Sequence, residues 1–583
     1  MITSNTLISI IIGQIMQKWD KLAVICGNEN KTYREIYEES FAISNHLSRM
    51  NLPPNSNIGV MPKRTTEFIS VILGILNAGH AYMPIPLEFP TNRVKEMMDY
   101  SRAPLMYFHS EIEHGAQGPH WYCYDKILKE ESHNRFQSID VDRKNTVYII
   151  YSSGTSNTPK AVMIPDEAVV SFFKSVKTRL AFTGNERLIS VCSVSFDLSI
   201  FELLISMAFG MTIILCDDDS YQPKGICELI QKHKADTIIA TPSMMKYILS
   251  YSKGQEKISS LQTIMLGGEI LSDSLVNEIR KFTKGKIVNV YGPCETTMFV
   301  TTAEVKEGEL ITIGKPLSNC KLILLDKTGC EVTDGTIGEI CIIGSNVGKG
   351  YISLPNLNKE KFGEIDGVRY YMTGDLGKRL ENGDFVFCGR QDNQLKINGF
   401  RIELEEIENA LAMYDGIKNV VVLPQISVNS EYTQLNCYYT ADMEISAVKL
   451  REYLSKKLPY YMRPSHFIRA EFIPLNENGK VNRKIIPVPY DKEKKKGIRI
   501  ISDENSKEVL DTIVRLLDDV HIYEEITPET LLETLGLTSI TFIKLVVELE
   551  TKYEIEFDDS DLNNDHFKTI DDVVKYVKRK AMI

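Results

Sequence analysis

Short apolar segments alternate with amphipathic helical segments between residues 188 and 240, and this alternation restricts the possible folds more than any other feature. Segments suited to strands lie at 188–192, 212–215 and 237–240, and helical patterns lie between them at 201–209 and 226–233. Such a period predicts a doubly wound, largely parallel sheet in an α/β domain. Ligands of these sheets bind beyond the carboxyl ends of the strands, so functional side chains are expected there.

The pattern extends toward the N-terminus. An apolar strand is predicted at 58–61, a nearly all-apolar helix at 68–76, and an amphipathic helix that opens at Thr32. The chain has 583 residues. A single hydrophobic core does not support a chain of this length, so we expect several domains.

A hydroxyl-rich loop at 151–160, with the sequence YSSGTSNTPK, follows an apolar strand segment at 147–150. Its hydroxyl groups, the flexible Gly154 and the cationic Lys160 can surround phosphate oxygens with hydrogen-bond donors and one positive charge. The loop is not a Walker loop, because the chain contains no G-x-x-x-x-G-K-[ST]. On this segment alone, a Ser/Thr-rich surface turn is an equally good interpretation.

Three other predicted strands end on unusual residues. Asp197 lies in the apolar segment 196–199, where a buried carboxylate needs a cation, although it could instead cap the helix that follows. Gly267 and Gly268 end a second strand, and NVYGPCETT at 289–297 ends a third with an aromatic ring, a turn and a carboxylate. These strand ends are candidate walls of a binding site.

The net charge of −11 is confined to the end of the chain. The residues from Asp503 onward hold 9 Lys and Arg against 20 Asp and Glu, and the rest of the chain holds 58 of each kind. A neutral body with an acidic tail indicates neither a nucleic acid nor an anionic membrane as a partner.

The N-terminal apolar segment 7–12 has no basic residues before it and no cleavage site after it, so we expect neither a signal peptide nor a membrane span. The 11 cysteines form no C-x-x-C pairs. This favours reduced thiols in the cytoplasm, without zinc or disulfides.

Five further motifs follow in order along the chain. They are GEICIIG at 338–344, YMTGDLG at 371–377, GRQDNQLKINGFRIE at 389–403, LPYYMRP at 458–464 and NGKVNR at 478–483. Together with the loop at 151–160, they resemble the motifs of the adenylate-forming superfamily, and most closely those of adenylation domains of nonribosomal peptide synthetases. The resemblance covers about residues 32–483 and implies a large N-terminal core with doubly wound sheets at 1–391 and a small α+β subdomain at 392–488.

The resemblance implies a nucleotide-binding role for several residues. Asp375 would accept hydrogen bonds from both ribose hydroxyls of ATP, with Arg390 as a nearby donor. Tyr291 would lie against adenine, and Glu295 would help to hold Mg²⁺, which prefers oxygen ligands. The other implied ATP contacts are Ser152, Ser153, Gly154, Gly268, Asn289 and Gly292.

The catalytic groups that the resemblance implies are Thr155 and Lys160 in the loop and two lysines of the small subdomain. Lys480 would contact the substrate carboxylate and the α-phosphate and stabilise the charge that develops as they join, although a solvated turn lysine is the alternative from local sequence. Asp392 would be the hinge about which the subdomain rotates, so that the face around Lys396 replaces Lys480 for thioester formation.

The chain departs from the family pattern at four positions. Asn157 and Ala161 stand where glycine is usual, Cys294 where threonine is usual, and Pro86 where aspartate is frequent. None of these differences removes a charged catalytic group.

The resemblance also implies a substrate pocket in which Asp197 binds the α-ammonium group of an amino acid. The rest of the implied lining is apolar and consists of Leu198, Phe201, Ile239, Met265, Gly267, Val290, Met298 and Phe299. A charged side chain would lose its water there without replacement, so we expect a small or medium aliphatic amino acid such as Ala, Val, Ile or Pro.

The residues after the small subdomain are expected to form a linker at 489–502 and a further domain at 503–583. The linker is largely charged, and the domain contains two apolar helical stripes and LGLTSI at 535–540. Ser539 could be a helix cap alone, but L-G-x-x-S-[IL] in an acidic helical domain resembles a peptidyl carrier protein, with Thr538 in place of the usual Asp or His. The resemblance implies an all-α helical bundle that carries 4'-phosphopantetheine on Ser539.

These features together predict an ATP-dependent, AMP-forming, Mg²⁺-requiring ligase that activates an amino acid and transfers it as a thioester to its own carrier domain, in nonribosomal peptide synthesis. The chain contains neither H-H-x-x-x-D-G nor G-x-S-x-G. Partners would therefore be a phosphopantetheinyl transferase and a downstream condensation, tailoring or release enzyme. The alternatives are an acyl or aryl acid ligase, disfavoured by Asp197 and the fused carrier, and a catalytically silent scaffold, disfavoured by the retained charged residues.

Overall fold

The computed structural model describes most of the chain. It covers residues 6–87, 89–112, 120–130, 134–136, 139, 141–152, 160–217, 220–391, 394–397, 400–426, 433–470, 472–473 and 486, and then 545, 546, 549, 553, 555, 557, 567 and 569–581. The chain divides into two compact units, of which the first is Met1–Glu406 with Lys457–Tyr461 and the second is Ile407–Lys456 with Met462–Ile583.

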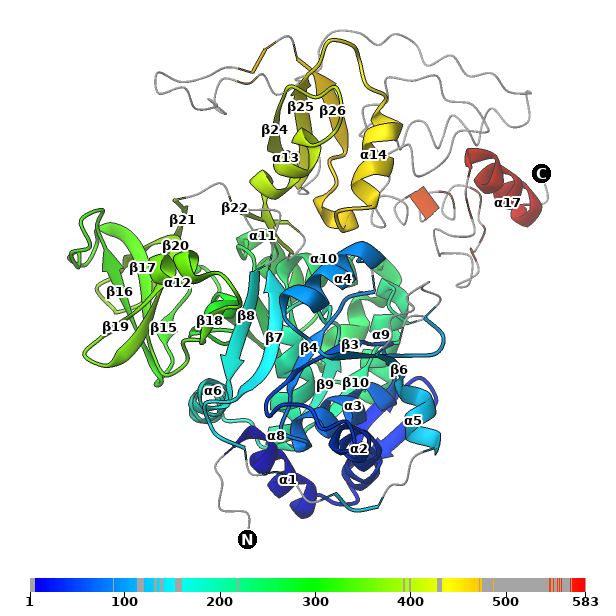
Figure 1. Ribbon diagram of the computed structural model, residues 1–583, viewed down its shortest axis with the longest axis vertical. Helices are drawn as coiled ribbons and strands as arrows, with labels where there is room; N and C mark the ends of the chain where they lie inside the picture. The colour runs from blue at the N-terminus through cyan, green and yellow to red at the C-terminus, as the bar shows by residue number, and fades with distance from the viewer. Residues whose placement is uncertain are drawn as a thin grey trace. The chain divides into compact units, whose positions relative to one another are not determined.

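The first unit contains a nine-stranded sheet in the order β15-β14-β13-β12-β11-β9-β10-β1-β2 (Figure 1). Neighbouring strands from β13 through to β1 are parallel, which confirms the doubly wound sheet that the alternation predicts. The bounds are β1 Leu22–Cys26, β2 Glu29–Thr32, β9 Arg187–Ser190, β10 Thr212–Leu215, β11 Thr237–Ala240, β12 Thr263–Gly267, β13 Lys286–Tyr291, β14 Thr301–Glu304 and β15 Lys315–Pro316.

The two helices predicted between these strands are present, and both begin earlier than expected; α9 Pro223–His233 starts at Pro223 rather than at residue 226. The helix predicted at 201–209 begins earlier, at Leu198, and a π-helical turn at Phe201–Ile205 interrupts it between α7 Leu198–Ile200 and α8 Ser206–Phe209. Turns of this kind are rare and concentrate at functional sites. The other connecting helices are α10 Pro242–Leu249 and α11 Asp273–Arg280.

A seven-stranded sheet, in the order β18-β8-β7-β4-β3-β5-β6, forms the second large sheet of this unit (Figure 1). Its strands are β3 Asn57–Met61, β4 Ala81–Pro84, β5 Leu105–Phe108, β6 Trp121–Cys123, β7 Thr146–Ser152, β8 Lys160–Pro165 and β18 Gly350–Tyr351. The accompanying helices are α1 Leu7–Gln17, α2 Tyr33–Ser48, α3 Thr66–Asn77, α4 Thr91–Tyr100, α5 Tyr124–Glu130 and α6 Asp166–Leu180. One hydrophobic core joins apolar residues of α1, α2, α3 and α6 to strands of both sheets.

Helix α2 starts where its sequence predicts. The Thr32 hydroxyl accepts a hydrogen bond from the Glu35 N–H at 3.2 Å, and the Glu35 carboxylate accepts one from the Thr32 N–H at 2.7 Å, which is a capping box. Helix α2 then packs closely on α3, because Gly74 has no side chain: a Cβ there would lie 2.6 Å from Cβ of Ile43.

An antiparallel sheet completes the first unit, with the order β16-β17-β20-β19 and β21 paired to β20. The hairpin β22–β23 follows it in the chain. The bounds are β16 Cys320–Leu325, β17 Ile337–Gly344, α12 Pro355–Lys361, β19 Phe362–Ile365, β20 Val368–Arg379, β21 Phe385–Arg390, β22 Gln394–Ile397 and β23 Phe400–Glu403.

The second unit contains a three-stranded sheet of β24 Asn419–Ile426, β25 Thr433–Thr440 and β26 His466–Arg469, and the helix α14 Ala447–Ser455. Helix α13 Leu404–Ala412 begins in the first unit and ends in the second. This combination of strands and helices agrees with the α+β subdomain expected from the sequence.

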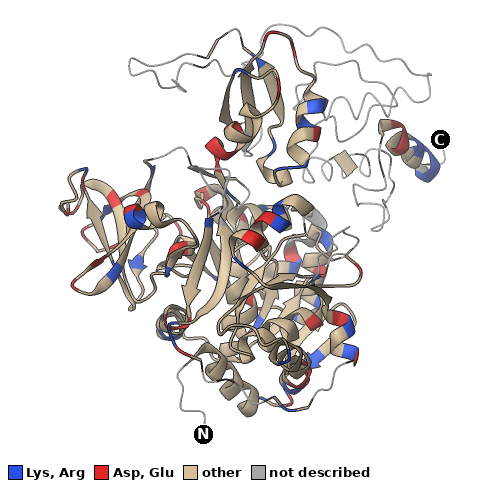
Figure 2. Cartoon of the chain, in the orientation of Figure 1, with Lys and Arg blue, Asp and Glu red and all other residues tan. Residues whose placement is uncertain are grey.

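Near the C-terminus lies the helix α17 Ile570–Ala581. The ring centroid of its Tyr576 lies 4.6 Å from that of Phe557 and 5.2 Å from that of Phe567. Asp571 and Asp572 lie in the first turn of α17 and Lys578, Arg579 and Lys580 in its last turn, as the helix dipole favours (Figure 2). The expected linker at 489–502 and Ser539 lie outside the described residues.

Candidate active site

The strand order of the nine-stranded sheet reverses at β9. This strand lies between β10 and β11, so successive connections wind in opposite directions from it. In doubly wound sheets, ligands bind in the crevice at such a reversal. Asp197 follows β9, Thr241 follows β11, Gly268 follows β12 and Gly292 follows β13, and all four line one cavity.

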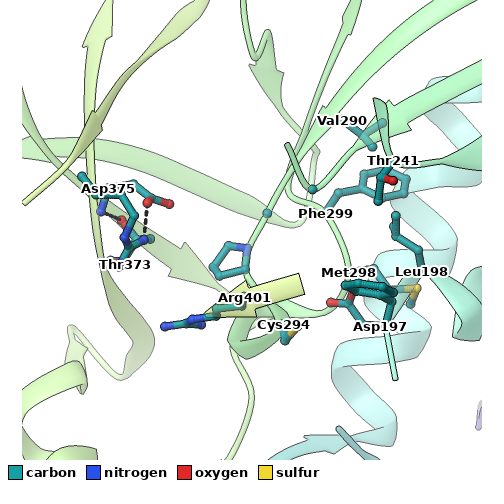
Figure 3. Close-up of a pocket in the computed structure, with 15 residues that line it drawn as sticks. Asp197, Leu198, Thr241, Val290, Cys294, Met298, Phe299, Thr373, Asp375 and Arg401 are labelled. Carbon is teal, nitrogen blue, oxygen red and sulfur yellow. Dashed lines mark hydrogen bonds and ion pairs between the residues drawn. The ribbon is translucent and has the colours of Figure 1, made fainter. Parts of the chain in front are cut away.

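In Figure 3, four apolar residues of the cavity, Leu198, Val290, Met298 and Phe299, lie on one side together with Asp197 and Thr241, and a set of polar residues lies on the other side. Thr373 and Asp375 lie on the polar side, and Cys294 and Arg401 lie between the two groups. The lining residues are Phe196, Asp197, Leu198, Thr241, Gly268, Val290, Gly292, Pro293, Cys294, Met298, Phe299, Thr373, Asp375, Arg390 and Arg401.

Two charged residues, the fully buried Glu202 and the partly buried Arg64, hold the end of β9. The Glu202 carboxylate accepts hydrogen bonds from the N–H groups of Val191 and Cys192, at 2.9 and 3.1 Å. The Arg64 guanidinium donates to the carbonyl oxygens of Cys192 and Ser190, both at 2.8 Å. Residues 190–192, where β9 ends, are therefore held by hydrogen bonds from both groups.

Asp197 precedes α7, but its side chain makes no capping hydrogen bond, which removes the main support for the helix-cap interpretation. Its exposed fraction is 6%. Burial, followed by the Asp197 carboxylate, raises the pKa of the Cys294 thiol, so the thiol stays protonated and can donate a hydrogen bond to the carboxylate. A buried carboxylate is stable beside a bound cation such as a substrate ammonium group.

The apolar wall contains four residues of the implied pocket, Leu198, Val290, Met298 and Phe299, and each of them is buried. Met298 adopts a positive φ of 63°, and its neighbour Thr297 a φ of 65°. Non-glycine residues in this conformation are strained, and such strain concentrates at functional sites.

The other four implied pocket residues lie behind this wall and do not line the cavity. The Phe201 ring packs against Phe299 with centroids 6.0 Å apart. A Cβ on Gly267 would lie 2.4 Å from Val290 Cγ2, so the glycine allows the wall to pack closely. Ile239 and Met265 are buried within β11 and β12.

The polar side of the cavity is built by cross-strand pairing. Asp375 on β20 lies opposite Arg390 on β21, and their side chains form an ion pair. The Tyr291 hydroxyl at the end of β13 donates to the other carboxylate oxygen of Asp375 at 2.6 Å. A carboxylate has about four lone-pair sites, so Asp375 keeps acceptor capacity for the two hydroxyls of a ribose.

Three further implied nucleotide contacts lie at the same strand ends. Asn289 is buried, and its amide donates to the Thr312 carbonyl oxygen at 2.8 Å. Gly268 has a φ of +85° and lines the cavity. A Cβ on Gly292 would lie 2.5 Å from the Phe299 Cα, so only glycine allows this approach of the two backbone segments.

Glu295 is fully buried beside the cavity. Arg401 donates to its two oxygens at 2.9 and 3.2 Å, and the Tyr351 hydroxyl donates at 2.7 Å. Burial opposes ionisation of this carboxyl, but Arg401 and the Tyr351 hydroxyl outweigh burial and lower its pKa to about 2. The ionised oxygens of Glu295 are the donors that Mg²⁺ prefers, so this residue fits the cation that the motif implies. Among the described residues, no cluster of three or more His, Cys, Asp and Glu side chains could hold a metal ion.

The described residues include only part of the implied catalytic set. Lys160 begins β8 and forms an ion pair of 2.9 Å with Glu403, with both side chains 8% exposed. Strand β7 ends at Ser152, and Lys396 lies in β22. The expected residues that lie outside the described part are Ser153, Gly154, Thr155, Asp392, Lys480 and Ser539.

Sequence reasoning gave no role to Arg401, Arg64, Glu202 or Thr241. Arg401 lies inside a quoted motif, but its partner Glu295 is 106 positions away. No pattern within a short stretch of sequence predicts a contact between residues so far apart. Thr241 could have been recognised as an N-cap, because it stands before Pro242 and accepts a hydrogen bond from the Met244 N–H at 3.1 Å.

Comparison with known proteins bears directly on this site. The family described as AMP-binding enzyme matches residues 14–352, and the family described as phosphopantetheine attachment site matches residues 508–577. Gramicidin S synthase 1 from Brevibacillus brevis is 29% identical over 97% of this chain and 51% of its own length. Zwittermicin A synthase ZmaJ from Bacillus cereus is 31% identical over 81% of this chain and 93% of its own length. The chain thus spans about half of gramicidin S synthase 1, and it spans 10% of bacitracin synthase 1 from Bacillus licheniformis.

Solved structures agree in fold. A nonribosomal peptide synthetase protein containing adenylation and PCP domains superposes with a TM-score of 0.82 at 23% identity, over 99% of this chain and 97% of that one. A four-domain nonribosomal peptide synthetase bound to AMP and glycine gives a TM-score of 0.60 at 28% identity, over 98% of this chain and 42% of that one. These likenesses confirm the expected fold class of an α/β core, an α+β subdomain and a helical carrier domain.

Within the described residues, no helix combines the length and the apolar character needed to cross a membrane. The two family matches also account for the cofactors: ATP with Mg²⁺ for the AMP-binding part, and 4'-phosphopantetheine for the attachment site. The chain belongs to the AMP-binding enzymes and, among them, to the adenylation and carrier-domain proteins of nonribosomal peptide synthesis.

Proposed function

We propose that the protein activates an amino acid with ATP and then transfers it to a phosphopantetheine thiol on its own Ser539. In the first step, a carboxylate oxygen of the amino acid bonds to the α-phosphorus of ATP, and the bond to the bridging oxygen breaks to release pyrophosphate. In the second step, the thiol sulfur attacks the acyl carbon, AMP leaves and the thiol proton is released.

The observation that carries this proposal is the pairing of two carboxylates in one cavity. Asp197 stands beside the apolar wall, where an α-ammonium group would balance its charge, and Asp375 stands on the polar side, where ribose hydroxyls would donate. The reacting carboxylate and the α-phosphate would then meet between them. When bound, Mg²⁺ would neutralise phosphate charge, and Glu295 would hold it.

We further propose that the substrate side chain is small or medium and aliphatic. Leu198, Val290, Met298 and Phe299 offer it no hydrogen-bonding group, and the bulk of Met298 and Phe299 limits its size. A charged side chain would be desolvated there without a partner. Thr241 and Cys294 are the weakly polar groups of the lining.

The experiment that tests the proposal is exchange of labelled pyrophosphate into ATP across a panel of carboxylates. We expect exchange with small and medium aliphatic amino acids such as Ala, Val, Ile or Pro and little with charged ones. Exchange supported only by carboxylates that lack an amino group would favour the acid-ligase alternative. If none of the carboxylates supports exchange, the catalytically silent scaffold would be favoured.

We place the reaction in the cytoplasm, where the 11 thiols would stay reduced. The partners we propose are a phosphopantetheinyl transferase that modifies Ser539 and a downstream condensation, tailoring or release enzyme that receives the product. We also propose that the functional domains follow the boundaries expected from the sequence, with Asp392 as the hinge, Lys480 serving adenylation and Lys396 serving transfer.

A further inference from the structure

Two consecutive residues at the edge of the cavity adopt a backbone conformation that their side chains disfavour. Thr297 has a φ of 65° and Met298 a φ of 63°, and both residues are buried. This left-handed conformation is uncommon outside glycine and is especially unfavourable for a β-branched residue such as threonine. In the described part of the chain, no other two neighbouring non-glycine residues share it. Contacts from elsewhere in the fold are needed to hold this left-handed turn.

The loop between β17 and β18 supplies these contacts through Asn346, which is 1% exposed. The side-chain amide of Asn346 donates a hydrogen bond to the carbonyl oxygen of Thr296 at 3.1 Å. The main-chain carbonyl oxygen of Asn346 accepts one from the Thr297 hydroxyl at 2.7 Å. One residue therefore binds the chain twice, immediately before Met298, and both bonds are buried.

Close packing determines the position of Asn346. A Cβ on Gly344 would lie 2.7 Å from Oδ1 of Asn346, so the glycine leaves room for the amide. On the other side of the loop, the Gly348 N–H donates to the carbonyl oxygen of Glu295 at 2.8 Å. Oδ1 of Asn346 has no hydrogen-bond partner among the described residues. The contribution of this side chain is therefore the donor that reaches Thr296.

The left-handed turn controls the direction of the chain as it enters the apolar wall. Met298 and Phe299 line the cavity on the same side as Asp197 (Figure 3). A change of φ at the turn would move both side chains. The polar side of the cavity depends on other contacts, such as the ion pair of Asp375 with Arg390. Loss of the turn should therefore disturb the apolar wall more than the polar side.

We propose that Asn346 is a positioning residue that determines which substrate side chains the pocket accepts. It holds the left-handed turn and thereby fixes Met298 and Phe299 as the wall of the pocket. Asn346 is not among the residues that line the cavity, so it acts through the turn alone. This inference rests on the proposed function, because it takes the wall to contact the side chain of an amino acid.

The test uses the full chain with Asn346→Ala, with Thr297→Val, which keeps the shape of threonine without its hydroxyl, and with both changes together. Asn319→Ala is the matched control. The main-chain carbonyl oxygen of Asn319 accepts a hydrogen bond from the Ser345 N–H at 3.3 Å, so Asn319 lies beside the same loop. Its side chain has no hydrogen-bond partner among the described residues.

Pyrophosphate exchange is measured for each variant with the preferred aliphatic amino acid and with phenylalanine, and KM is determined for the amino acid and for ATP. Thermal midpoints establish a temperature at which every variant is folded. The ratio of kcat/KM for the two amino acids does not depend on the amount of folded enzyme. A change in this ratio therefore cannot come from a loss of stability alone.

Asn346→Ala and Thr297→Val should each lower kcat/KM for the aliphatic amino acid by roughly three- to tenfold, the effect of losing one buried hydrogen bond. The loss should appear mainly in KM for the amino acid, and the preference over phenylalanine should fall roughly threefold or more. KM for ATP should stay within about twofold, as should every parameter of Asn319→Ala. The double variant should lose little more than either single variant, because both residues hold the same turn.

Three results would overturn the proposal. The first is an unchanged preference between the two amino acids in both single variants. The second is a rise in KM for ATP as large as the rise for the amino acid. The third is an equal change in Asn319→Ala. If the wild type supports exchange with no amino acid, the proposed function itself fails, whereas normal exchange by the wild type with one of these three results overturns this inference alone.

Discussion

At the scale of single residues, the substrate assignment depends on Asp197. The residue is buried, makes no capping hydrogen bond to the helix it precedes, and lines a cavity whose neighbouring wall is apolar. These surroundings support the proposed role of Asp197 as an ammonium ligand, whereas its sequence context left a helix cap open.

Asp197→Asn should lower kcat/KM for an amino acid by about a hundred- to a thousandfold. Removing one partner of a buried charge pair costs about 3 to 5 kcal/mol, and roughly 1.4 kcal/mol corresponds to a factor of ten. The deamino analogue of the same acid, which has no ammonium group, should lose far less. Pyrophosphate exchange measured in parallel with the two acids is the test, and equal losses for both would contradict the assignment.

At the scale of elements, the sequence patterns predicted the sheets well. Strands at 212–215 and 237–240 match β10 and β11, and the capping box at Thr32 starts α2. These elements are encoded locally, by apolar periodicity and by residues three positions apart. The pocket residues were implied by the resemblance, and five of the nine line the cavity, namely Asp197, Leu198, Val290, Met298 and Phe299.

What could not be predicted depends on contacts between distant segments. The π-helical turn at Phe201–Ile205, the Glu202 and Arg64 pair below Asp197, and the ion pairs of the β22–β23 hairpin all arise from tertiary packing. The four implied pocket residues behind the wall were placed by resemblance. Whether these four residues reach the cavity depends on which other side chains line it. The sequence of one chain does not reveal that packing.

Helix α6 offers a test of how two elements are joined. Its first residue, Asp166, accepts a hydrogen bond from the Leu7 N–H at the start of α1 at 2.8 Å. Its other carboxylate oxygen has no hydrogen-bond partner among the described residues. Burial raises the pKa of Asp166 to about 6. Above this pH the carboxylate is ionised at a cost to stability.

Because the folded-state pKa of Asp166 is above the unfolded value of about 3.9, its contribution to stability is present below pH ~4 and is lost as the pH rises to about 6. Asp166→Asn keeps an acceptor for Leu7 and should raise the free energy of unfolding at pH 7 to 8 by up to roughly 3 kcal/mol. The gain should vanish near pH 4. Thermal midpoints measured against pH check this, with Glu167→Gln, an exposed neighbour on the same helix turn, as the control. A gain that is equal at all pH values would contradict it.

At the scale of the whole molecule, the chain joins an AMP-binding part to a phosphopantetheine attachment site. The family matches at 14–352 and 508–577 mark the two parts, and the net negative charge of the chain lies in the residues from Asp503 onward. An adenylation site needs a thiol acceptor to continue, and an attachment site needs an acyl donor. The central claim is that the two parts act on one another.

The most direct test of this claim is the intact mass of the protein after incubation with coenzyme A, a broad phosphopantetheinyl transferase, ATP, Mg²⁺ and the amino acid that gives the strongest exchange. The wild type should gain the mass of one phosphopantetheine and then the mass of one aminoacyl group. Hydroxylamine, which cleaves thioesters, should remove only the aminoacyl group. Ser539→Ala should gain neither mass while it retains pyrophosphate exchange. A wild type that takes up phosphopantetheine but never the aminoacyl group, or an alanine variant that becomes loaded, would contradict the account.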